Sequence, residues 1–195
     1  MEKSLTFILL KDKFFYNLVR FFSGEEYFHV IVALDPECSS LFSFRKTVTR
    51  EDLTRYRSSL ECLVLEFEID AEKHAALAEF IRDQYEHRGE FGYNYLGSFL
   101  TMITCAPLFR IGFFPLKLAG RLLTRPPRFI CSTWLAWVLH RCGINPFAGG
   151  FNPKIPPTAD YRVTMAYDFS KANLPVRYRG TIGEFVKENR ICTQS

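Results

Sequence analysis

The chain has 195 residues, of which 48% are hydrophobic, and its formal net charge is +4 from 25 basic and 21 acidic side chains. This length suits one domain that builds its own core. The net charge is too small to indicate nucleic-acid binding, although it is compatible with a weak preference for anionic surfaces. The 20 phenylalanines indicate a bulky aromatic core or an apolar binding channel.

The cysteine pattern argues against disulfides and structural zinc. The six cysteines form no C-x-x-C pair and no Cys/His set with zinc spacing; they are Cys38, Cys62, Cys105, Cys131, Cys142 and Cys192. Reduced thiols in a cytoplasmic protein without metal or cofactor are expected. The opening residues 1–10 resemble a first strand and not a signal peptide, since they lack a small-residue cleavage site.

Apolar and β-branched runs predict most elements of the first half. Strands are expected at Leu5–Leu10, Tyr27–Leu34, Leu41–Phe44 and Glu61–Ile69. A helix is expected between Asp12 and Gly24, and a second from Asp70 to Tyr85. The charged and polar residues 45–59 are expected to form a loop.

The second half is more irregular. Helices are expected at Tyr93–Met102 and from Cys131 to about His140, with short strands around Tyr161–Tyr167 and Val176–Thr181. The element order predicts an α+β fold, with residues 1–195 as a single domain that carries an apolar and basic insertion near 99–128.

Residues 91–109 contain no charged side chain, and about twenty apolar residues suffice to span a bilayer. Asn94, two glycines, two threonines and Pro107 interrupt this stretch, which favours a buried helix over a membrane span. The neighbouring segment 99–123 is aromatic and carries Arg and Lys. It is expected to be either a lid on the core or a peripheral, membrane-surface element.

Cys131 is the strongest candidate for a reactive group. An apolar approach changes at this residue into a helical pattern, so the sulfur should lie at a helix N-terminus. There the unpaired N–H groups and the helix dipole favour an anion. The thiol pKa should therefore fall, which makes the sulfur a usable nucleophile.

A cysteine nucleophile usually works with a histidine. His74 and His87 lie in charged helical segments, and His140 lies roughly 13 Å from Cys131 along the same helix. His29 is the histidine that lies inside an apolar strand, where an imidazole requires a polar partner. It is therefore the candidate base.

Five short motifs occur in one order along the chain: YFHVIVALD at 27–35, FSFR at 42–45, YNYLG at 93–97, FICSTWLA at 129–136 and PTAD at 157–160. They resemble the motifs Y-x-H-x-x-I-A-L-D, Y-S-F-G-R, Y-N-x-L-G, F-x-C-S-x-F-V-A and P-x-D of the YiiX/YycO-like proteins. These proteins are the circularly permuted branch of the NlpC-type superfamily, which has a papain-like fold. The resemblance covers most of residues 4–165.

The resemblance implies a permuted papain-like fold in which an antiparallel sheet packs against a Cys-bearing helix. It implies Cys131 as nucleophile and His29 as general base, with the histidine first in the chain, as permutation requires. Ser43 is the candidate third residue, which would orient the imidazole; the family's glutamate after this strand has a possible counterpart in Glu51. Candidate substrate-binding residues in or beside the motifs are Tyr27, Arg45, Tyr93 and Ser132.

The expected activity is that of a thiol hydrolase of the peptidase or amidase type, which acts through an acyl-enzyme. Two alternatives stay open. One is a lipid acyltransferase or thioesterase, as in the related lecithin:retinol acyltransferase group. The other is a papain-fold module that binds a peptide or lipid without turnover. The expected partner is a peptide or acyl substrate and not nucleic acid; peripheral membrane contact through 99–123 is the alternative to a lid in that segment.

Overall fold

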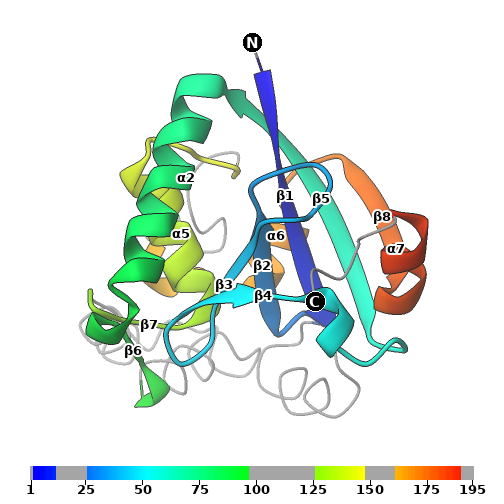
Figure 1. The fold of residues 1–195 in the computed structure, drawn as a ribbon, viewed down its shortest axis with the longest axis horizontal. Coiled ribbons are helices and arrows are strands. Elements are labelled where there is room, and N and C mark those ends of the chain that lie inside the picture. Colours follow the sequence, from blue (N-terminus) through cyan, green and yellow to red (C-terminus); the bar gives the residue numbers. More distant parts are fainter. Residues whose placement is uncertain (1, 12–25, 97–125, 148–160, 190–195) are drawn as a thin grey trace, which may run out of the picture.

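A six-stranded antiparallel sheet forms the centre of the molecule (Figure 1). The computed structural model describes residues 2–11, 26–96, 126–147 and 161–189. The sheet has the order β4-β3-β2-β1-β5-β8. Its strands are β1 (Glu2–Lys11), β2 (His29–Ala33), β3 (Leu41–Phe44), β4 (Val48–Glu51), β5 (Glu61–Asp70) and β8 (Val176–Thr181). A separate parallel pair is formed by β6 (Gly92–Tyr93) and β7 (Arg128–Phe129).

Helices cover the sheet. The α-helices are α2 (Ala71–Glu86), α5 (Cys131–Arg141), α6 (Ala166–Ser170) and α7 (Ile182–Glu188). The short 3-10 helices are η1 (Leu53–Arg55), η2 (Arg88–Glu90) and η4 (Tyr161–Val163). The neighbouring helices α2 and α5 lie together on one side of the sheet, and α7 lies beside β8 (Figure 1).

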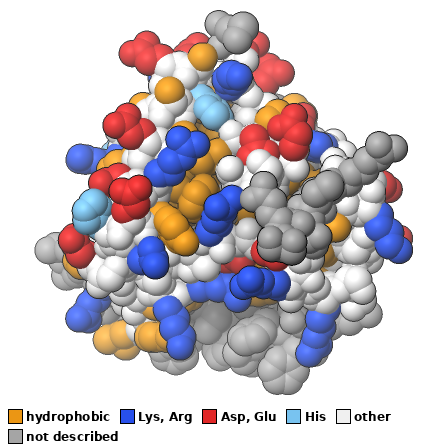
Figure 2. Space-filling model, viewed as in Figure 1, with side chains coloured by type: hydrophobic (Ala, Val, Ile, Leu, Met, Phe, Trp, Pro, Cys, Tyr) orange, Lys and Arg blue, Asp and Glu red, His pale blue; other side chains and the backbone are white. Residues whose placement is uncertain are grey.

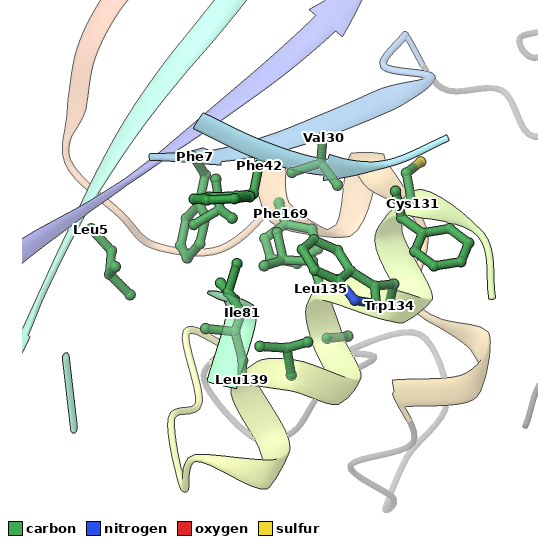
Figure 3. Packing of buried hydrophobic residues seen from close by; sticks show 14 of the residues in the cluster. Leu5, Phe7, Val30, Phe42, Ile81, Cys131, Trp134, Leu135, Leu139 and Phe169 are labelled. Carbon is green, nitrogen blue, oxygen red and sulfur yellow. The ribbon is translucent and has the colours of Figure 1, made fainter. Parts of the chain in front are cut away.

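The central strand β1 is buried on both faces of the sheet, which explains its unbroken apolar sequence. Leu5, Phe7 and Leu9 pack into the cluster that includes α2 and α5, whereas Ile8 and Leu10 pack into the cluster that includes α7. Figure 3 shows the first cluster, with Phe7 and Leu135 inside it and Cys131 at its edge beside the strands. The core thus continues to the candidate nucleophile.

The predicted α+β class with an antiparallel sheet is confirmed, but two local predictions are wrong. Residues 45–59 are not a loop, because Val48–Glu51 pair with β3 as strand β4 and η1 follows. The residues around Tyr161–Tyr167 form η4 and the start of α6 instead of a strand. There Tyr167 and Phe169 are both buried, and α6 packs against β1.

Other predictions concern residues that the structure does not describe. The helix expected between Asp12 and Gly24 and most of the insertion at 99–128 lie outside the described residues. Of the helix expected at Tyr93–Met102, Tyr93 belongs to β6, and residues from 97 onward lie outside the description. Within the described ranges, no helix is both long enough and apolar enough to cross a membrane.

Candidate active site

Cys131 is the first residue of α5, and the local sequence explains why the helix begins there. The Ile130 N–H donates to Thr133 Oγ1 at 3.0 Å, which is one half of a capping box. The Trp134 N–H donates to the Ile130 carbonyl at 2.9 Å and closes the first helical turn. Cys131 therefore lies in the first turn, where backbone N–H groups have no partner within the helix.

Packing fixes the position of α5. Trp134 is buried, and its Nε1 donates to Gln84 Oε1 of α2 at 2.8 Å. Leu135 and Leu139 are fully buried in the same cluster. Trp134 and Gln84 are both buried, so their contact fixes α5 against α2. The sulfur of Cys131 is therefore held at a defined place beside the sheet.

His29 is the first residue of β2, and α5 packs against this strand. The pairing between β2 and β3 involves only Val32 and Ala33 of β2, so the start of β2 is not paired with β3. The Cys131 thiol lies 3.8 Å from the carbonyl oxygen of Phe28, the residue before His29. The start of β2 and the start of α5 therefore meet.

The two side chains shift each other's pKa in opposite directions. Burial alone disfavours the Cys131 thiolate, but the His29 charge and the N–H groups of Val30 and Ser132 outweigh it and lower the thiol pKa below 9.0. Burial alone would also lower the pKa of His29, but the Cys131 thiolate and Glu51 outweigh it and raise that pKa to about 9. These opposed shifts favour a thiolate and an imidazolium over the neutral pair.

Glu51 supplies a carboxylate beside the imidazole of His29. Its Oε1 lies 3.9 Å from His29 Nε2, a distance that is too long for a hydrogen bond but suits an ion pair. The Glu51 side chain is only 4% exposed. Burial would raise its pKa, but His29, Ser43 and Arg45 together lower it to about 2. Glu51 is therefore a buried anion across the neutral pH range.

Four hydrogen bonds from three side chains hold the Glu51 carboxylate. The Ser43 hydroxyl and Arg45 Nε donate to Oε1, the latter at 2.8 Å. Arg45 Nη2 and the Tyr56 hydroxyl donate to Oε2 at 3.2 and 3.0 Å. A carboxylate with this many donors is fixed in both position and charge state.

The other predicted site residues differ in how closely they are connected to Cys131, His29 and Glu51. Ser43 is bonded to Glu51, so one carboxylate separates it from the imidazole. Ser132 is buried beside Cys131, and its hydroxyl has no hydrogen-bond partner among the described residues. Tyr93 stacks on Phe44, with ring centres 6.4 Å apart. The charges that act on the Tyr27 phenol are those of Arg179, Glu26, Lys11 and Glu61, which do not belong to this centre.

Sequence reasoning named Glu51 only as a possible counterpart of a family residue. The signal that locates it is the register of a short hairpin: Ser43 pairs with Thr49 and Leu41 pairs with Glu51. Because alternate residues of a strand share a face, Ser43 and Glu51 lie on the same face as diagonal neighbours. If residues 45–59 are assigned to a loop, no strand pairing is expected there, and the position of Glu51 beside Ser43 cannot be predicted.

Within the described ranges, no group of three or more His, Cys, Asp or Glu side chains is arranged to hold a metal ion. No protein-family model, curated protein or solved structure matches the chain. The site combines a polarised thiol, a buried imidazole and a buried carboxylate, an arrangement that suits nucleophilic catalysis by cysteine.

Proposed function

We propose that the chain is a cysteine hydrolase in which Cys131 is the nucleophile, His29 the acid and base, and Glu51 the residue that orients His29. The observation that carries this proposal is geometric: the Cys131 thiol lies 3.8 Å from the carbonyl oxygen of the residue before His29, and His29 Nε2 lies 3.9 Å from the buried Glu51 carboxylate. The opposed pKa shifts of Cys131 and His29 agree with this arrangement. A structural cysteine in an apolar core has a raised pKa, as the buried thiols of Cys38 and Cys62 do. The pKa of the Cys131 thiol is lowered instead.

The proposed reaction has two halves. The Cys131 thiolate attacks a substrate carbonyl carbon, and the imidazolium of His29 then gives its proton to the departing amine, alkoxide or thiolate. This forms an acyl-enzyme with a thioester at Cys131. Water, with His29 as base, attacks that thioester and releases the acid and the free thiolate. N–H groups at the start of α5, that of Cys131 included, would stabilise the tetrahedral oxyanion.

Glu51 replaces Ser43 as the proposed third member of the site. A carboxylate stabilises an imidazolium electrostatically, which a neutral hydroxyl does far more weakly. Ser43 then has the supporting role of donating to Glu51, which it shares with Arg45 and Tyr56.

The proposed fold is a permuted papain-like domain. In that arrangement the histidine-bearing strand precedes the cysteine-bearing helix in the chain, as β2 precedes α5 here. The antiparallel sheet with α5 packed against β2 and β3 supports this assignment.

One observation favours the lipid branch of the same chemistry. Tyr95 and Leu96 are 67% and 59% exposed, and in sequence they lie within the uncharged stretch from residue 91 to residue 109. Exposed aromatic and aliphatic side chains of this kind suit contact with a lipid interface. Acyl transfer or hydrolysis on a lipid, with peripheral membrane contact, is therefore the second candidate.

Intact-mass spectrometry after brief incubation with an activated ester, an acyl thioester and a dipeptide amide would test the proposal. We expect one acyl group on Cys131, no adduct in Cys131→Ala, and an unchanged adduct in the control Cys142→Ala. Preferential acylation by long-chain over short-chain thioesters would favour the lipid branch. Absence of an adduct with every probe, together with no turnover, would leave a binding module and contradict the hydrolase.

A further inference from the structure

Arg45 follows β3 and lies at the border between the candidate site and solvent. Its Nε and Nη2 donate to the Glu51 carboxylate, and Nη2 also lies 2.6 Å from the Tyr56 hydroxyl. The guanidinium also lies over the Tyr56 ring, 5.1 Å from its centre. The side chain is nevertheless 52% exposed. Arg45 is therefore held in one orientation while part of its planar fork stays accessible.

The guanidinium of Arg45 has hydrogen-bond donors that its contacts with Glu51 and Tyr56 do not use. A guanidinium carries five N–H groups, and the bonds to Glu51 and Tyr56 use only those on Nε and Nη2. The N–H groups on Nη1 take no part in these bonds. A preorganised arginine loses little side-chain entropy when it binds an anion, and its fork matches carboxylate and phosphate oxygens.

The surface around Arg45 is also basic. Residues 45–57 contain five basic and two acidic side chains, and Glu51 is buried. The other acid, Asp52, is bound by Thr54 and paired with Arg55. The remaining basic residues of the segment are exposed; they are Lys46, Arg50, Arg55 and Arg57. Figure 2 shows Lys and Arg side chains over the part of the surface where Figure 1 places β4.

We infer that Arg45 is a specificity-determining residue that binds an anionic group, a carboxylate or a phosphate, on the substrate of Cys131. This inference rests on the proposed function and names its substrate class: acyl compounds that carry an acid at some distance from the scissile carbonyl. Glu51 does not cancel this preference, because its single negative charge is shared between Arg45 and His29.

The test compares two alkylating probes that differ only in the charge of their tail. N-iodoacetyl-4-aminobutyrate and its N-methylamide react with the thiolate in the same way: a C–S bond forms and iodide leaves. The ratio of the two rates at Cys131, followed by peptide mass, isolates anion recognition from the general reactivity of the sulfur. The reference ratio is that of a small free thiol.

In the wild type we expect the anionic probe to be favoured about fivefold over the reference ratio, as a partly exposed charge pair suggests. Arg45→Gln should return the ratio to the reference, and Arg45→Lys should keep part of the preference. The matched control is Arg50→Gln, which also removes one positive charge. Arg50 precedes Glu51 on β4, and its side chain lies on the opposite face of the strand from Glu51.

The outcomes separate this inference from the proposed function. A wild-type preference that survives Arg45→Gln, or that is lost equally in Arg50→Gln, would overturn the role of Arg45. Fast alkylation by both probes without preference would also overturn it and would leave the hydrolase proposal intact. Reaction with both probes as slow as that of a free thiol would instead contradict the activated nucleophile.

Discussion

Replacement of His29 by alanine should slow the alkylation of Cys131 by iodoacetamide at about pH 6 by roughly ten- to a hundredfold. The imidazolium charge of His29 outweighs burial and lowers the pKa of the wild-type thiol below its ordinary value, so we expect thiolate to be present at that pH. Without His29, only the N–H groups of Val30 and Ser132 oppose burial, so the pKa of the thiol should rise. The lower intrinsic nucleophilicity of a low-pKa thiolate offsets part of the gain, so the effect is smaller than the change in thiolate fraction.

Peptide mass spectrometry would follow this reaction at Cys131 in the presence of the other thiols. His74→Ala is the matched control, since His74 is bonded to the Leu34 carbonyl and does not contribute to the pKa of Cys131. It should react at the wild-type rate. A His29→Ala protein that reacts within about twofold of the wild type would remove His29 from the site.

The second large effect is expected for Glu51→Gln, which keeps the shape of the side chain and removes its charge. The folded pKa of Glu51 is about 2, against an ordinary value of 4.5. Its contribution to stability is therefore fully present above about pH 4.5 and is lost as pH falls toward about 2. A pKa shift of this size corresponds to roughly 3 kcal/mol.

Urea unfolding of both proteins at a series of pH values would measure this contribution. At neutral pH we expect Glu51→Gln to be less stable by roughly 3 kcal/mol, because Arg45 and His29 lose their counter-charge. The difference should shrink as pH falls through the range from about 4.5 to 2. Glu66→Gln, which removes a more exposed carboxylate paired with Arg177, should show a much smaller effect. A Glu51→Gln protein as stable as the wild type at neutral pH would show that the carboxylate is not held as described.

The parts of the fold that sequence could predict are those decided by local pattern. The apolar run of β1 predicted a buried strand, and the change of pattern at Cys131 predicted the start of α5. The residues 161–167 show the limit of this reasoning: Tyr161, Val163, Met165 and Tyr167 alternate as in a strand, yet packing against α5 and β1 makes this region helical. Tertiary contacts decided the outcome there.

The candidate site was predictable only in part, for a related reason. Cys131 and His29 follow from a helix start and from a polar residue in an apolar strand. The role of Glu51 depends on the pairing of β3 with β4, and β4 is a short edge strand with charged residues, a composition that resembles a loop. Which side chain faces His29 is set by that pairing and not by local sequence.

The central claim is that Cys131 and His29 form a thiolate–imidazolium pair at neutral pH. The most direct test is the ultraviolet absorbance of the thiolate, measured as the difference between the wild type and Cys131→Ser while pH is raised from about 4 to 10. We predict that the difference signal of one thiolate is already present at about pH 6. A signal that appears only near the ordinary thiol pKa of 9.0, or above it, would contradict the account.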